Sequence, residues 1–278
     1  MSSADRLAHL GFTQGRFADR PASLNCFVFG AVLALLFLLP TAASARVVVS
    51  LEFDDATADQ AQLGPELADR GMRATLFVNS GLLGTKGFLT QEQLLGLQAQ
   101  GNEIGGHTTT HAELPGLTPE MQEAEVCDDR KALAAMGFAV TDFAYPSGAY
   151  SPLTKGVVSS CGYQSARTVG FVVCRGCRSA ETLPPLDPFA TRTRESVTAW
   201  TTLTQLKRAV LKAERGRRVG WLQIVFHQIC EDCTQGSISP PVLAIFLDWL
   251  RLRSAQTPVM TVREALARTR FRTPRPRR

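Results

Sequence analysis

The sequence of 278 residues has few histidines and no long hydrophobic run. Only four histidines are present, and three of them, His107, His111 and His227, follow Arg46. The longest uncharged apolar run, Cys26–Leu39, has 14 residues, which is short for a transmembrane helix of about 20 apolar residues. The chain also lacks internal repeats and linker-like stretches, which favours a single domain with a sizeable core.

Net positive charge is confined to the ends of the chain. The formal net charge is +5 at pH 7, but residues 268–278 carry six arginines and no acid. Residues 46–267 are therefore close to neutral, which argues against a basic nucleic-acid-binding surface on this part of the chain. The last segment combines arginine with proline and has almost no apolar residues, so we expect a basic disordered tail over residues 268–278.

The first 45 residues have the pattern of a secretory signal. Three arginines precede the apolar run, and the small residues Ala43 and Ala45 follow it. This order predicts a signal peptide over residues 1–45, cleaved after Ala45, and export to the periplasm or the extracellular space. An uncleaved membrane anchor is the alternative, and we expect no stable membrane insertion beyond this segment.

The spacing of the cysteines leaves two interpretations open. Six cysteines follow residue 45, and an even number in an oxidising compartment favours disulfide bonds. We expect a bond between Cys127 and Cys161, with the other four cysteines tying two loops together. The pairs 174–177 and 230–233 also have the Cys-x-x-Cys spacing of a structural zinc site.

Strand-like and helix-like stretches alternate after Arg46. Residues 47–53 are rich in β-branched side chains without a helical period, which predicts a buried strand. A Thr-x-x-Gln box begins a helix at Thr90, and Thr118 followed by proline begins another. About seven or eight strand–helix units fit, so we expect one α/β domain over residues 46–267, a distorted (β/α) barrel with about seven parallel strands. The other expected elements are strands at 74–81, 102–107, 141–146, 163–169, 221–227 and 258–262, and helices at 58–70, 240–253 and after 262.

The residues that carry chemistry cluster at the ends of these strands. Asp54 and Asp55 directly follow the first strand, His227 follows a later one, and His107 and His111 follow a Gly-Gly strand end. In parallel α/β barrels the active site forms at the carboxyl ends of the strands. A lone Asp-Asp pair is usual in a solvated loop, and a lone His-x-x-x-His pair is weak as a signal. Their coincidence at strand ends favours one shared site.

This combination predicts a metal centre with a separate base. His107 and His111 are spaced to bind one tetrahedral zinc if a helical turn begins at Thr108. One carboxylate then completes a His-His-Asp site and leaves a position for water. The other carboxylate stays free to accept the proton of that water, whose pKa a metal lowers to about 7.

Four motifs occur in the order of a known family. The segments "LEFDDAT", "HTTTH", "FAYPSGAY" and "IVFHQI" resemble those of the polysaccharide deacetylase family, also called NodB-homology domains or carbohydrate esterase family 4. The resemblance covers nearly all of the chain after residue 45. It implies a NodB-type distorted (β/α) barrel that removes acetyl groups from N-acetylated sugars with a divalent metal, commonly zinc.

The resemblance also implies roles for single residues. Asp54 would be the general base, and His227 the general acid that protonates the leaving amine. The backbone N–H of Ser147 would share the tetrahedral oxyanion with the metal, and Tyr145 lies beside it in the same motif. The implied metal ligands are Asp55, His107 and His111.

The third motif departs from the family pattern. Ala144 stands where the family often has an arginine that pairs with the base, and Ser147 stands where it has an aromatic residue. We therefore expect another arginine to orient the base. The candidates are Arg167, Arg192 and Arg194.

The expected partner is an N-acetylated glycan. Tyr145, Tyr150 and Trp200 are candidates for an exposed ring that stacks on a sugar, whereas Trp249 lies in an amphipathic helix pattern and is expected to pack in the core. Two alternatives remain open. One is a catalytically weak or inactive glycan-binding protein of the same fold, and the other is a deacylase of a non-sugar amide.

Overall fold

Eight strands form one sheet in the order β6-β8-β1-β2-β3-β4-β5-β7. The computed structural model describes residues 47–172, 179–216 and 219–270. All strand pairs in these residues are parallel except β6 with β8. Strand β7 lies at one edge of the sheet and also contacts β8 and β6 at the other edge, so the sheet nearly closes. This confirms the predicted barrel. The strands are β1 Val47–Asp54, β2 Thr75–Val78, β3 Glu103–Gly106, β4 Asp142–Ala144, β5 Ser165–Phe171, β6 Glu181–Thr182, β7 Thr191–Thr193 and β8 Gly220–Phe226.

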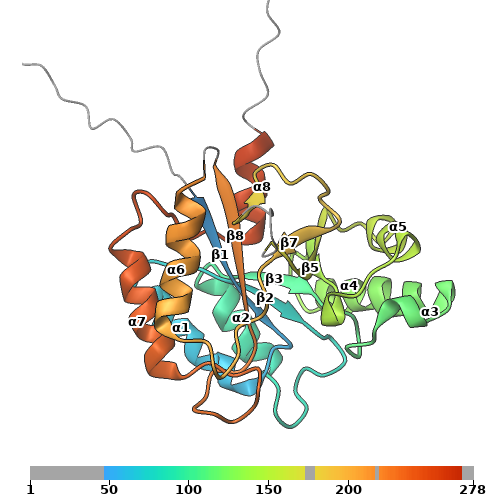
Figure 1. Ribbon diagram of the computed structural model, residues 1–278. Helices are drawn as coiled ribbons and strands as arrows, with labels where there is room; N and C mark the ends of the chain where they lie inside the picture. Colours follow the sequence, from blue (N-terminus) through green and yellow to red (C-terminus); the bar gives the residue numbers. More distant parts are fainter. Residues whose placement is uncertain (1–46, 173–178, 217–218, 271–278) are drawn as a thin grey trace, which may run out of the picture. The chain divides into compact units, whose positions relative to one another are not determined.

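Helices pack against the outside of the sheet. Figure 1 shows α6 beside β1 and β8 and α7 next to α6, while α5 contacts β5 and α4 contacts β3. The α-helices are α1 Leu63–Ala68, α2 Gln91–Ala99, α3 Pro119–Glu123, α4 Asp129–Ala135, α5 Pro152–Ser160, α6 Leu203–Glu214, α7 Pro240–Arg251 and α8 Val262–Arg270. Shorter turns are η1 Ala58–Gln62, η2 Leu114–Gly116, the π-type η3 Ala124–Asp128 and η4 Pro146–Gly148.

Strand β1 is buried on both faces. Its odd-numbered residues, Val47 to Phe53, join the apolar cluster that contains Leu206 of α6 and Leu247 of α7. Because side chains alternate along a strand, the even-numbered residues face the other way, into the barrel. There Val48 packs in a second cluster, while Ser50, Glu52 and Asp54 form a line of polar groups leading to the end of the strand.

The opposite end of the barrel is closed by apolar side chains. Val262 and Ala265 of α8 pack with Val48 and Trp221 in the interior cluster. The indole N–H of Trp221 donates to Ser50 Oγ at 2.9 Å. This packing leaves the carboxyl ends of the strands as the end at which the site residues gather.

The helix caps agree with the sequence. Thr90 and Gln93 form the expected capping box of α2, and the Thr118 side chain accepts from Met121 N at the start of α3. The sequence predicts a continuous helix at 58–70 and another that begins at Thr118, and neither is continuous in the structure. The first is η1 followed by the short α1, and the second is interrupted by η3.

Two further expectations near the C-terminus need correction. Residues 258–262 do not form a strand; a single bridge joins Val49 and Val259. Helix α8 runs to Arg270, so the first residues of the segment expected to be disordered are helical. The rest of that tail and the predicted signal peptide lie outside the described residues.

The disulfides match the expectation in part. Cys127 and Cys161 are bonded, as predicted. Cys230 is bonded to Cys233 in the same loop, so the expectation that the other four cysteines tie two loops together is wrong. Residues 174 and 177 lie outside the described residues. Among the described helices, none combines the length and hydropathy that crossing a bilayer needs.

Candidate metal centre and active site

Three strand ends bring the predicted site residues together. Asp54 ends β1 and Asp55 follows it, His107 follows β3, and His227 follows β8. Because β8, β1, β2 and β3 are consecutive neighbours in the sheet, their carboxyl ends lie on one edge. The sheet order therefore gathers residues that are up to 173 positions apart in the sequence.

Three side chains meet as expected for a metal centre. Asp55 Oδ1 lies 3.5 Å from His107 Nε2 and 3.4 Å from His111 Nε2. Ligand atoms 2.0–2.1 Å from a tetrahedral zinc lie about 3.3–3.4 Å apart, so these separations fit a shared ion. Asp55 Oδ1 is also buried without a hydrogen-bond donor, which is costly unless a cation compensates it. The donor set and its geometry therefore suit a divalent metal.

The ring of His107 is fixed in the orientation that a ligand needs. Its Nδ1 lies 2.7 Å from the carbonyl oxygen of Ala144. A carbonyl can only accept, so Nδ1 carries the proton and the lone pair of Nε2 points toward Asp55. The Asn79 side chain also donates to the backbone oxygens of His107 and Thr108, which holds the loop in place.

The loop that carries both histidines is not helical, contrary to the expected turn at Thr108. Thr108 has a φ of 67° and His111 a φ of 65°, in the left-handed region. In the described part of the chain, most non-glycine residues with positive φ lie at these strand ends, and each costs on the order of 1 kcal/mol. The members of this group are Asp55, Ala56, Thr108, His111 and Ser147.

The charges at the centre favour an ionised Asp55. Burial would raise the pKa of Asp55, but the interaction with His107, together with the charges of His227 and His111, lowers it to about 2. Burial lowers the pKa of His107, and the interaction with Asp55 outweighs it and raises the pKa. The pKa of His111 is lowered by burial and by the charge of His107. A carboxylate and at least one neutral imidazole are the ligand forms that a metal binds.

Asp54 has a different set of neighbours from Asp55. Arg167 Nη2 donates to Asp54 Oδ1, and both side chains are almost fully buried. The other oxygen, Oδ2, lies 3.8 Å from His227 Nε2. Asp54 is therefore anchored through one oxygen and faces the predicted acid through the other.

The structure distinguishes the three candidate arginines. Arg167 of β5 contacts Asp54, and its Nε also donates to Glu52 Oε2 at 2.8 Å. Arg192 pairs instead with Glu181 at 2.6 Å. Arg194 is half-buried, which lowers its pKa, and has no described contact with Asp54.

Two glycines allow β3 to approach its neighbours closely. A Cβ on Gly105 would lie 2.6 Å from the Phe77 ring, and a Cβ on Gly106 would lie 2.0 Å from the Tyr163 hydroxyl. Both separations are below any normal contact. The Gly-Gly pair thus lets the strand that leads to His107 fit beside β2 and the residues behind it.

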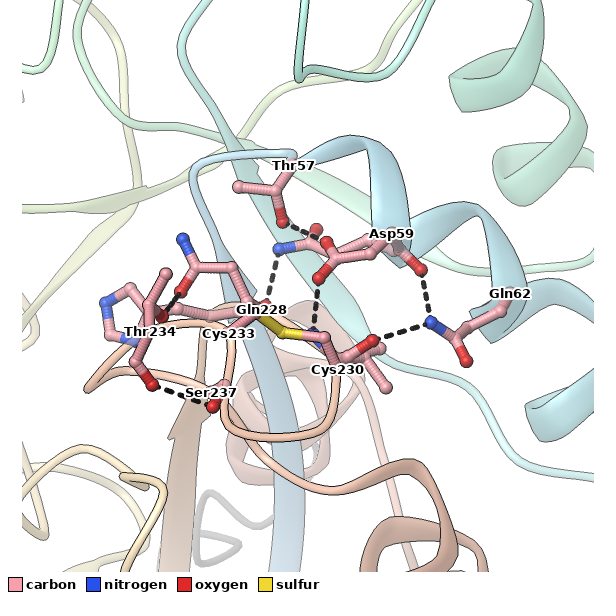
Figure 2. The surroundings of a disulfide bond; sticks show 11 residues. Thr57, Asp59, Gln62, Gln228, Cys230, Cys233, Thr234 and Ser237 are labelled. Atoms are coloured by element: carbon pink, nitrogen blue, oxygen red, sulfur yellow. Dashed lines mark hydrogen bonds between the residues drawn. A yellow bond between two sulfur atoms is a disulfide. The ribbon is translucent and has the colours of Figure 1, made fainter.

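Residues that the sequence analysis missed join the first motif to the loop after β8. Gln60 Nε2 donates to Asp54 O at 2.6 Å and to His227 O at 3.0 Å, so one amide bridges the ends of β1 and β8. Asp59 Oδ2 accepts from Ile229 N, and Gln62 donates to Ile229 O. Figure 2 shows the bonds of Asp59 and Gln62 beside the Cys230–Cys233 disulfide. The position of these residues in a turn directly after Asp54-Asp55 was the only sequence signal for them.

The aromatic candidates differ in exposure. Tyr145 is fully buried and its hydroxyl donates to Phe189 O, so the expectation that it is an exposed ring is wrong. Tyr150 stacks on Tyr145 and is 38% exposed, and Trp200 is 68% exposed. Trp249 packs against the core and stacks on Phe246, as expected.

Comparison with known proteins adds to this geometry. A family model described as polysaccharide deacetylase matches residues 42–166. A protein of Bacillus subtilis (strain 168), "Putative polysaccharide deacetylase YxkH", is 37% identical over 122 residues, which are 43% of this chain and 44% of that protein. Residues 42–166 of the chain are therefore similar to the polysaccharide deacetylase family. The chain spans less than half the length of that curated relative.

Solved structures of lower sequence identity share the fold of this chain. A Streptococcus pyogenes deacetylase, PplD, in complex with acetate is 23% identical, with a TM-score of 0.51 over 58% of this chain and 70% of that one. The Xyl-CE4 domain of a multidomain xylanase, from the hindgut metagenome of Trinervitermes trinervoides, is 16% identical, with a TM-score of 0.54 over 81% of this chain and 91% of that one. The matched family segment contains the Asp-Asp pair and both loop histidines, whereas Arg167 and His227 lie beyond it.

Proposed function

We propose that the protein is a divalent-metal-dependent hydrolase that removes N-acetyl groups from an N-acetylated polysaccharide or oligosaccharide. The observation that carries this proposal is Asp55 Oδ1, a buried oxygen without a donor, placed between the Nε2 atoms of His107 and His111. The match of residues 42–166 to the polysaccharide deacetylase model supports the reaction class, and the arrangement of Asp54 and His227 beside the centre supports turnover.

We propose zinc as the metal. Two imidazole nitrogens and one carboxylate oxygen are a common catalytic zinc set, which leaves an open position. Bound there, the ion would supply Lewis acidity that polarises the acetyl carbonyl and makes a neighbouring water more nucleophilic at neutral pH.

The residues of the chain supply the proton transfers. Asp54 accepts a proton from the attacking water at Oδ2 while Arg167 holds Oδ1. The water oxygen bonds to the carbonyl carbon, and the Ser147 N–H donates to the carbonyl oxygen as it gains charge. The C–N bond then breaks, and the His227 ring gives a proton to the leaving nitrogen. The products are acetate and a free amine on the sugar.

We further propose that the substrate lies outside the cytoplasm. The signal pattern of residues 1–45 supports export, and the two described disulfides are typical of an oxidising compartment. The exposed rings of Tyr150 and Trp200 are proposed to stack on sugar units, since aromatic faces bury apolar sugar surface at little entropic cost.

The test is acetate release by the purified chain. N-acetylglucosamine hexamer, peptidoglycan and poly-N-acetylglucosamine are incubated with the enzyme as purified, after EDTA treatment, and after zinc is added back. We expect acetate from at least one glycan, its loss with EDTA and its recovery with zinc. Asp69→Asn changes an exposed acid on the outer surface and serves as the matched control.

Two results would contradict the proposal. Zinc binding without acetate release from any glycan would favour the glycan-binding alternative. Acetate release only from a small non-sugar amide would favour the deacylase alternative.

A further inference from the structure

A buried arginine and a buried glutamic acid accompany the base of this site. Arg167 of β5 lies opposite Ala144 of β4 in the register of the two parallel strands. The arginine that the family often has at position 144 is thus supplied from the paired position of the next strand. Glu52 contacts this displaced arginine, and its side chain is fully buried. No role for Glu52 follows from the proposed chemistry alone.

Glu52 and Asp54 divide one edge of the guanidinium between them. Arg167 Nε donates to Glu52 Oε2 at 2.8 Å, and Nη2 donates to Asp54 Oδ1. A single carboxylate commonly takes both of these donors as a bidentate pair. Glu52 thus occupies Nε, Asp54 is contacted by Nη2, and Nη1 is buried without a hydrogen-bond partner.

This division determines which oxygen of Asp54 is available. Asp54 Oδ2 has no part in the arginine contact and lies 3.8 Å from His227 Nε2. If Glu52 did not accept from Nε, both donors of the edge would be free to bind the two oxygens of Asp54. The carboxylate would then be held in the plane of the guanidinium. Its Oδ2 would bind the arginine and would no longer face the substrate.

The charge balance is consistent with this role. Burial raises the pKa of Glu52 to about 8, with the charges of Asp54 and Asp142 adding to the rise and Arg167 opposing it. Oε1 of Glu52 is buried without a partner, which would be costly for a full carboxylate. A neutral Glu52 still accepts from Nε through Oε2, and it leaves the positive charge of Arg167 to Asp54.

We propose that Glu52 is a positioning residue, which occupies Nε of Arg167 so that Asp54 is held by one oxygen and presents the other to the substrate. The inference rests on the proposed function of Asp54 as the base. It assigns to a buried acid of β1 a task beyond that of a structural counter-charge.

A matched pair of variants tests the proposal. Glu52→Gln keeps an oxygen that accepts from Nε, whereas Glu52→Met has nearly the same size and no acceptor. We expect Glu52→Gln to keep kcat within about fivefold of the wild type. We expect Glu52→Met to lower kcat about 10- to 100-fold with KM and zinc content unchanged, because a small misplacement of a catalytic group has an effect of that size. Asp69→Asn is again the surface control.

Two measurements separate positioning from simple stabilisation. The Arg167→Lys variant lacks the neighbouring Nε and Nη2 donors that Glu52 and Asp54 share. Adding Glu52→Met to this variant should therefore lower kcat no further. If Glu52→Met alone folds poorly, kcat is compared in the same Arg167→Lys background, with Glu52→Leu as a second apolar variant. Equal kcat for Glu52→Gln and the apolar variants, with only a lower melting temperature, would overturn the proposal.

Crystal structures of the variants keep this test independent of the activity assay. We expect Asp54 to be bound by one guanidinium N–H in Glu52→Gln and by two in the apolar variants. An unchanged single contact in the apolar variants would overturn the inference even if the wild type is a deacetylase. If the wild type releases no acetate, the proposed function fails. The crystal structures of the variants still decide whether Glu52 limits Asp54 to one guanidinium N–H.

Discussion

At the scale of single residues, two adjacent acids have different surroundings and therefore different proposed tasks. Asp55 has a left-handed φ of 72°, which turns its side chain away from the line of the strand and toward the histidines. Asp54 is still part of β1 and stays in the row of even-numbered interior residues with Glu52. The change of backbone conformation between them allows one carboxylate to face a metal and the other an arginine.

Replacing the proposed base should separate chemistry from metal binding. Asp54→Asn keeps the size of the side chain and one oxygen for Arg167, but it removes the proton acceptor. We expect kcat for acetate release to fall 10²- to 10⁴-fold, while zinc content, measured by elemental analysis, stays as in the wild type. A loss of zinc together with activity would contradict the division of roles between the two acids.

The raised pKa of Glu52 predicts a pH dependence of stability. Between its ordinary value of 4.5 and about 8 the folded state keeps a proton that the unfolded state releases. The folded state then binds more protons, so the free energy of unfolding falls as pH rises, by up to about 1.4 kcal/mol per pH unit from this group. Glu52→Gln does not titrate and should lack this contribution.

Urea unfolding of both proteins from pH 5 to pH 9 measures this effect. We expect Glu52→Gln to gain stability relative to the wild type as pH rises through this range and to level off above about pH 8. A constant difference between the two proteins over the whole range would show that the glutamic acid ionises normally.

At the scale of elements, the carboxyl ends of the strands are strained and are held by neighbouring segments. Gln60 of η1 bonds to backbone oxygens at the ends of both β1 and β8, and Asn79, just after β2, bonds to the loop after β3. These amides donate to backbone carbonyls at the strand ends and in the loop after β3. The positive-φ residues persist because such contacts fix the backbone around them.

The two described disulfides should differ in their effect on folding stability. Cys127–Cys161 closes a loop with a sequence separation of 34 and joins η3 to the end of α5, whereas Cys230 and Cys233 are separated by 3. By loop-closure entropy the first contributes about 4 kcal/mol and the second about 2 kcal/mol.

Double serine variants of each pair test this difference by chemical unfolding. We expect the Cys127→Ser/Cys161→Ser protein to lose roughly twice the unfolding free energy that the Cys230→Ser/Cys233→Ser protein loses. Equal losses would indicate that local contacts around the bonds, and not chain entropy, determine their contribution.

At the scale of the whole molecule, the proposed metal joins two parts of the barrel. Asp55 follows β1, while His107 and His111 follow β3, with β2 between these strands. An ion bound by all three would link loops that are otherwise connected through amide side chains and the sheet. Binding to the folded state alone stabilises it by mass action.

Zinc should therefore raise the melting temperature of the metal-free protein. At about 1,000 times the dissociation constant the gain is about 4 kcal/mol, which corresponds to on the order of 10 °C for a domain of this size. Thermal unfolding of EDTA-treated protein with added zinc measures the shift. His111→Ala should remove most of it, whereas Asp69→Asn should keep it in full, and an equal shift in both variants would place the zinc elsewhere.

The local pattern of the chain was sufficient for much of the fold. The β-branched run at residues 47–53 predicts β1 because it can be buried on both faces, and Thr90 with Gln93 predicts the start of α2 because the cap uses only neighbouring atoms. Expectations failed where distant contacts decide. Residues 258–262 form a bridge and not a strand, and Cys230 bonds within its own loop.

The sequence by itself determined the residue types of the site and their order at strand ends, since strand, turn and motif are short-range properties. Only the tertiary structure decided which arginine meets Asp54, that Glu52 shares it, and that the His107 loop brings two imidazoles to Asp55 without a helical turn. The physical reason is that these contacts depend on strand register and barrel closure. Both place residues more than 100 positions apart within hydrogen-bonding distance.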